Sequence, residues 1–109
     1  MNIRIKTTNT TVTPSIEDDI NTKLGKLEKF FREEDKLYVE IEVDPKHKSG
    51  LRYRTEIDIQ PKGFYAEARG NDFYEAFDLT LPKIKDQLMK EKDKRVSLRR
   101  RKKGVKGLE

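Results

Sequence analysis

Apolar and polar residues alternate in four segments of the chain. Over residues 37–43 and 51–59, nearly every second residue is apolar and the residues between are polar or charged. Because side chains of a strand point alternately to its two faces, this period of two predicts strands with one apolar face. Shorter alternations over residues 3–6 and 64–68 predict two further strands.

Helical spacing of apolar residues predicts a first helix between the first and second strands. Its stripe comprises Ile16, Ile20, Leu24, Leu27 and Phe31. Thr13 is suited to cap this helix, and Pro14 is suited to its first turn, where an N–H would have no partner. We expect the helix to end in a loop at the acidic residues 33–35.

A second helix is predicted after the last strand. Its stripe comprises Phe73, Phe77, Leu81, Ile84 and Leu88. Asp72 begins this helix, with Glu75 as its capping partner three residues later. The helical register can continue to about Arg95, and Pro82 should kink the helix because it removes one backbone hydrogen bond. Residues 96–109 are interpreted as a frayed helix end or flexible tail.

Together these elements predict an α+β fold in the order β-α-β-β-β-α. The economical arrangement is a four-stranded sheet with both helices on one face and a polar opposite face. The first strand should lie parallel to the second, joined by a right-handed helical crossover. We expect one domain over residues 1–95, followed by a basic tail or the start of a linker over residues 96–109.

The composition restricts the chemistry of this domain. The chain of 109 residues has no cysteine, which excludes disulfides and thiolate metal sites and fits a reducing cytoplasm. No apolar run approaches the roughly 20 residues that a membrane helix needs. We therefore expect a soluble, cytoplasmic protein with no membrane partner.

Charge is distributed unevenly along the chain, whose net charge is +5. Residues 83–107 hold twelve Lys/Arg and three Asp/Glu, whereas residues 1–82 hold thirteen basic and sixteen acidic residues. Such asymmetry indicates a polyanionic partner. The alternative is a basic tail that only increases solubility.

Lysines recur on both predicted helices. Lys23, Lys26 and Lys29 line one flank and the outer surface of the first helix. On the second helix, Lys83, Lys90 and Lys94 form one stripe beside the buried face. Two neighbouring helices with such stripes can make a groove of positive potential that suits phosphates. The alternative is that these lysines only form ordinary solvated faces.

The sequence offers little for catalysis. His47 is the single histidine and lies in a predicted turn, without the partners that a nucleophile–base pair or a zinc site needs. Glu40 and Glu42 point the same way, but Arg52 and Arg54 on the next strand supply a simpler explanation as cross-strand partners. Glycine-rich phosphate loops are absent. We expect no enzyme activity, cofactor, metal or small-molecule substrate.

Three segments resemble the bacterial ribosome hibernation-promoting factors, also called ribosome-associated inhibitor A or sigma-54 modulation proteins. They are residues 1–5 with 12–14 (MNIRI and VTP), residues 23–31 (KLGKLEKFF) and residues 70–78 (GNDFYEAFD). The resemblance extends from Met1 to about Arg95. It implies a fold similar to a double-stranded RNA-binding domain. It also implies a site in the small ribosomal subunit, between head and body, where mRNA and tRNA would otherwise lie and where occupancy blocks translation in idle or stressed cells.

The resemblance also indicates residues that contact ribosomal RNA. With the helix positions above, the candidates are Lys23, Lys26, Lys29, Lys83, Lys85, Lys90, Lys92, Lys94 and Arg95. Asp86 stands where the family usually has a basic residue, and Lys85 beside it can compensate. Pro82 is a second departure, because the kink that it should cause in the second helix changes the angle of the lysine stripe.

Several alternatives stay open at this level. The chain is either a short factor or the excised N-terminal domain of a long one, and we favour the latter; homodimerisation would require the missing C-terminal domain. A generic double-stranded RNA module, or a protein-interaction module acting on a transcription factor, would fit the same fold. Tyr38 and Tyr65 on the open sheet face are candidates for stacking bases, although the surrounding pattern differs from that of an RRM.

Overall fold

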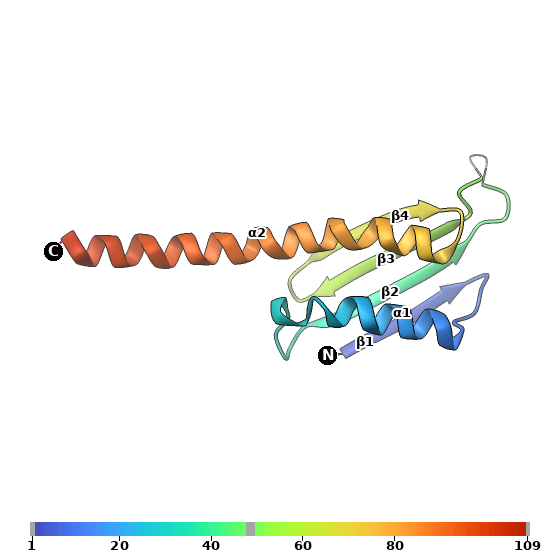
Figure 1. The fold of residues 1–109 in the computed structure, drawn as a ribbon, viewed down its shortest axis with the longest axis horizontal. Helices are drawn as coiled ribbons and strands as arrows, with labels where there is room; N and C mark the ends of the chain where they lie inside the picture. The colour runs from blue at the N-terminus through green and yellow to red at the C-terminus, as the bar shows by residue number, and fades with distance from the viewer. Residues whose placement is uncertain (1, 48–49, 109) are drawn as a thin grey trace.

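The computed structural model describes residues 2–47 and 50–108, with side chains described as far as Lys94. The elements are β1 (Asn2–Thr8), α1 (Pro14–Gly25), the 3-10 helix η1 (Glu28–Phe30), β2 (Lys36–Val43), β3 (Tyr53–Gln60), β4 (Phe64–Gly70) and α2 (Phe73–Leu108). Both helices lie on the same face of the sheet, so the molecule has two layers (Figure 1). The predicted α+β fold and element order are confirmed, and η1 is an addition.

The sheet has four strands in the order β1-β2-β3-β4. β1 pairs with β2 in parallel, as predicted, while β2–β3 and β3–β4 are antiparallel. Glu42 lies opposite Arg54, as predicted, but Glu40 lies opposite Glu56. The expectation that Glu40 faces an arginine was therefore wrong, because an antiparallel register that pairs position 42 with position 54 must pair position 40 with position 56.

The core fills the space between the sheet and the two helices. Its fully buried members include Ile20, Leu24, Leu37, Val39, Ile41, Ile57, Ile59, Phe77, Ile84 and Leu88. Each such side chain contributes about 1.5–3 kcal/mol of transfer free energy on burial. These contacts hold both helices against the sheet and so place the surfaces that the helices present to solvent.

The first helix ends earlier than its apolar stripe suggested. α1 stops at Gly25, a residue type that is costly inside a helix, and the chain then tightens into η1. This change of register buries Phe30, which is 8% exposed, and leaves Phe31 only partly buried. Phe31, predicted to close the buried stripe, packs against the core but is only partly buried, because the 3.6-residue period does not continue to it.

Side-chain caps start both helices as the sequence predicted. Thr13 Oγ1 accepts a hydrogen bond from the Ile16 N–H at 3.2 Å. Asp72 Oδ1 accepts from the Glu75 N–H at 2.8 Å, while the Glu75 carboxylate accepts from the Asn71 N–H at 3.4 Å. These caps satisfy N–H groups that have no partner within the first turn.

α2 approaches the end of β4 so closely that only glycine fits there. A Cβ atom on Gly70 would lie 2.5 Å from the Ala76 backbone nitrogen. Further along the helix, the Thr80 hydroxyl donates to the Ala76 carbonyl at 2.8 Å and lies 2.7 Å from the Thr55 hydroxyl on β3. Both threonines are fully buried. This polar contact fixes the rotation of α2 against the sheet and hence the direction of its lysines.

α2 is longer than predicted. It continues through Pro82 to Leu108 as one helix, and Figure 1 shows it extending well beyond the sheet. Lysine, arginine and leucine are good helix formers, which accounts for helical backbone beyond the last core contact at Leu88. The boundary at residue 95 remains a prediction. No helix within the described residues combines the length and apolar character needed to cross a membrane.

Candidate nucleic-acid interface

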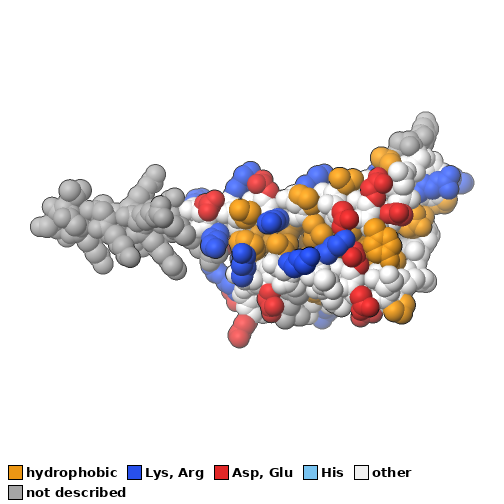
Figure 2. Space-filling model, in the orientation of Figure 1, with side chains coloured by type: hydrophobic (Ala, Val, Ile, Leu, Met, Phe, Trp, Pro, Cys, Tyr) orange, Lys and Arg blue, Asp and Glu red, His pale blue; other side chains and the backbone are white. Residues whose placement is uncertain are grey.

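A groove of about 410 Å³ lies between α1 and α2 on the helix face of the molecule. Its lining comprises Lys23, Lys26, Leu27, Asp78, Leu81, Pro82 and Lys85. Figure 2 views this face and shows Lys and Arg side chains along the boundary between the two helices, with apolar surface among them. Three of the predicted site residues are therefore brought to one concave surface, namely Lys23, Lys26 and Lys85.

Lys23 joins the two helices across this groove. Its Nζ lies 3.1 Å from the Asp19 carboxylate on α1 and donates a hydrogen bond to Asp78 on α2. Partial burial opposes the charged ammonium, but the hydrogen bonds to Asp78 and Asp19 outweigh burial and raise the pKa of Lys23 above its usual value. Lys23 is thus charged, but two carboxylates already balance its charge.

Lys26 and Lys85 differ from Lys23 in their surroundings. Both side chains are exposed on the groove rim, Lys26 directly after α1 and Lys85 on α2. Neither forms an ion pair with any described residue. An ammonium group without a carboxylate partner keeps its full attraction for an external anion. These two lysines are therefore the most available cations of the groove.

Lys29 and Lys92 meet over the Phe30 ring, at the junction of η1 with α2. Their Nζ atoms lie 5.3 Å and 5.7 Å from the centroid of the Phe30 ring. Such cation–π contacts contribute about 0.5–1 kcal/mol each at exposed sites. The Phe30 ring thus brings two further predicted site residues, Lys29 and Lys92, together on the side of α2 that faces α1.

Lys83, Lys90 and Lys94 do not face α1, contrary to the expected pairing of lysine stripes. Lys83 donates to the Glu67 carbonyl on β4 at 2.9 Å, and helical spacing places Lys90 and Lys94 on the same flank. Lys90 pairs with Asp86 at 3.0 Å, and its side chain is 76% exposed. The expected groove exists, but α2 lines it with Lys85 because α1 packs against the opposite flank. Arg95 lies outside the residues whose side chains are described.

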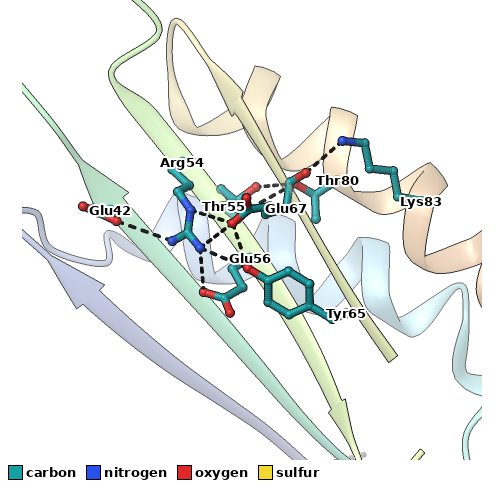
Figure 3. Close-up of polar contacts among 8 residues, drawn as sticks. All are labelled: Glu42, Arg54, Thr55, Glu56, Tyr65, Glu67, Thr80 and Lys83. Carbon is teal, nitrogen blue, oxygen red and sulfur yellow. Dashed lines mark hydrogen bonds and ion pairs between the residues drawn. The ribbon is translucent and has the colours of Figure 1, made fainter. Parts of the chain in front are cut away.

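The open face of the sheet carries a second set of charges, centred on Arg54 (Figure 3). Its guanidinium donates to Glu67 at 2.8 Å, to Glu56 at 3.1 Å and to Glu42 at 3.4 Å. It also donates to the Tyr65 hydroxyl at 3.1 Å. One cation thus holds three carboxylates from three strands. The prediction of an arginine–glutamate contact across this face is confirmed for Arg54 and Glu42.

This network changes the titration of its members. Burial is the largest single influence and opposes the charge of Arg54, but the hydrogen bond to Glu67 and the charges of Glu67 and Glu56 together outweigh it and raise the pKa of the guanidinium. Burial and the hydrogen bond to Glu67 raise the pKa of Tyr65 to about 12. Hydrogen bonds from Tyr65 and Arg54 lower the pKa of Glu67. The phenol therefore stays a donor to a carboxylate that stays ionised, and the network is internally satisfied at neutral pH.

Sequence reasoning missed the apolar floor of the groove. Leu27 and Leu81 were predicted as core, and Pro82 as the cause of a kink, but all three line the groove. Leu27 is 6% exposed, Leu81 is partly buried and Pro82 is exposed. The available signal was helical position, because Leu81 lies at the edge of the apolar stripe next to Lys85 on the surface of the second helix.

Comparison with known proteins finds a family model described as Sigma 54 modulation protein / S30EA ribosomal protein, which matches residues 3–96. A ribosome hibernation promoting factor of Klebsiella oxytoca is 31% identical, with 86% of this chain and 96% of the relative covered. A ribosome hibernation promotion factor of Bacillus subtilis is 30% identical over 86% of this chain, but this covers only 50% of the relative.

Solved structures show the same fold. The N-terminal domain of Thermus thermophilus Protein Y superposes with a TM-score of 0.66 at 26% identity, covering 81% of this chain and 96% of that one. A ribosomal subunit interface protein of Coxiella burnetii gives a TM-score of 0.69 at 18% identity, covering 85% and 99%. The chain belongs to the Sigma 54 modulation protein / S30EA ribosomal protein family.

Proposed function

We propose that this chain is a ribosome hibernation factor that binds the small ribosomal subunit through its helix face and inhibits translation in idle or stressed cells. The observation that carries the proposal is the match to the Klebsiella oxytoca factor, since it spans nearly the whole relative. The names of the relatives describe no catalytic activity. Ribosome association also implies that the chain acts in the cytoplasm.

The chemistry of the helix face supports ribosomal RNA as the contact. The groove rim carries Lys26 and Lys85 without carboxylate partners among the described residues, and Lys29 and Lys92 add two cations over the Phe30 ring, where η1 meets α2. Lysine is a point charge on a flexible stem, so it reaches phosphates without requiring one fixed geometry. A surface of this kind fits the phosphate-lined channel in which mRNA and tRNA lie on the small subunit.

Sedimentation with purified ribosomal subunits tests this proposal. The full chain should migrate with the small subunit, leave it as salt is raised, and be displaced by mRNA together with tRNA. A chain that stays at the top of the gradient at low salt would contradict the proposal. Binding to a free RNA duplex as tight as to the subunit would instead favour a generic double-stranded RNA module.

A further inference from the structure

The groove between α1 and α2 has features that phosphate binding alone does not explain. Its floor is formed by Leu27, Leu81 and Pro82, while its rim carries Lys26 and Lys85. The backbone of an RNA duplex presents charged phosphates and polar sugars, which are not stabilised by contact with an apolar floor. A nucleobase, in contrast, has an apolar planar face and is attached to phosphates.

We propose that this groove receives one unstacked nucleotide of the RNA, with its base on the apolar floor and its flanking phosphates on Lys26 and Lys85. This inference rests on the proposed function and specifies its ligand. Bases that are splayed out of a helix are bound in this way, by an apolar or aromatic surface below the base and cations beside its backbone.

The dimensions and charge of the groove suit such an occupant. Its volume of about 410 Å³ falls in the range of roughly 300–1,000 Å³ typical of sites for small organic ligands. Three lysines and one aspartate line it, so its net charge is positive. Lys23 pairs with both Asp78 and Asp19, so these three groups together carry a net charge of −1, and the two rim lysines, Lys26 and Lys85, make the total positive.

Hydrogen-bond acceptors are also present beside the floor. Pro82 has no N–H, so the usual helix hydrogen bond to the Asp78 carbonyl is missing where both residues line the groove. The Asp78 carboxylate has further acceptor capacity beyond its bond to Lys23. Every RNA base carries at least one N–H group on its pairing edge. Once the base is unpaired, this N–H can donate a hydrogen bond to one of these acceptors.

Three RNA hairpins that differ at one position test the proposal with the full chain. The first carries a single bulged adenosine, the second an abasic residue at the same bulge, and the third no bulge. Fluorescence anisotropy measures the Kd of each, and chemical-shift mapping identifies the residues contacted. We expect the adenosine bulge to bind about tenfold more tightly than the abasic bulge, because only the former brings a base to the apolar floor.

Two variants locate the base, and one serves as control. Pro82→Glu places a carboxylate on the floor at an exposed position and should remove the preference for the base. The double variant Lys26→Ala, Lys85→Ala should weaken both bulged hairpins, because both keep their phosphates. Lys6→Ala removes one exposed lysine from the opposite sheet face and should retain the tenfold preference. Circular dichroism should show the same helical content in all three variants.

The proposal is overturned if the three hairpins bind equally, if none binds, or if the preference survives Pro82→Glu. Small-subunit sedimentation separates this inference from the proposed function. Should the wild-type chain bind the subunit while showing no preference for the bulged base, only the nucleotide site is wrong. Failure to bind the subunit at all would remove the proposed function itself.

Discussion

The helix face and the open sheet face both carry many charges, but Arg54 on the sheet and the two rim lysines of the groove differ in their surroundings. On the sheet face, Arg54 is held by Glu42, Glu56 and Glu67. On the helix face, Lys26 and Lys85 have no ion-pair partner among the described residues. The number of basic residues is therefore a poor guide to polyanion binding, because a cation already satisfied by carboxylates gains little from a phosphate.

The groove itself shows the same distinction on a smaller scale. Lys23 lies between Asp19 and Asp78 and connects the two helices. Lys85 stands on the same rim without such a partner. We infer that Lys23 mainly positions α1 against α2, whereas Lys85 and Lys26 attract the RNA. The following experiments test whether available charge, rather than total charge, decides binding.

Charge reversal should give the largest difference in small-subunit binding between variants of the helix face and variants of the sheet face. Lys26→Glu with Lys85→Glu should weaken small-subunit binding by about a hundredfold, since two charge-assisted contacts contribute roughly 1.5 kcal/mol each. The matched control, Arg4→Glu with Lys6→Glu, changes the net charge equally on the sheet face and should alter Kd by less than about twofold. Equal losses from the two double variants would show that only total charge matters.

Removal of Arg54 should affect stability and leave binding intact. Arg54→Ala leaves three neighbouring carboxylates without their shared cation, so the free energy of unfolding should fall by about 1–2 kcal/mol. Urea denaturation measures this loss, and Arg54→Lys should restore part of it by returning the charge without the forked geometry. Unchanged stability together with lost subunit binding would mean that Arg54 belongs to the interface.

Salt dependence measures how many phosphates each face engages. If roughly six phosphates are contacted, the slope of log K against log salt should be about −4 to −5. Lys26→Ala with Lys85→Ala should make this slope shallower by about 1.5, because two phosphate contacts are lost. Lys6→Ala with Arg4→Ala should leave it unchanged, and an equal change in both double variants would contradict the assignment.

The smallest effect concerns the titration of Tyr65. Its pKa is raised from 10.0 to about 12 by burial and by its hydrogen bond to Glu67. A raised folded-state pKa means that this stabilisation is present below pH 10 and is lost as the pH rises toward 12. The phenolate absorbance of the wild type minus that of Tyr65→Phe should show this ionisation.

Glu67→Gln provides the control for that titration. It removes the carboxylate that favours the protonated phenol, so the pKa of Tyr65 should return toward 10.0. A titration that stays unchanged in Glu67→Gln would show that burial alone raises the pKa of Tyr65. The sheet-face network would then be less tightly coupled than its geometry indicates.

Much of the fold was accessible from the sequence because the signals are local. The alternation over residues 37–43 gave β2, and the parallel placement of β1 followed from one intervening helix. Thr13 and Asp72 cap the helices that they were predicted to start. The burial of Phe30 was not predicted. The chain changes from α-helix to 3-10 helix after Gly25, and this change moves the buried position from Phe31 to Phe30.

The sequence by itself determined the order of strands and helices and that each helical region carries lysines, since period and charge belong to the chain alone. Only the tertiary structure decided which lysines share a groove. Lys85 lies on the flank of α2 that faces α1, whereas Lys83 reaches β4. That choice depends on the rotation of α2 against the sheet, which contacts between distant residues such as Thr55 and Thr80 impose.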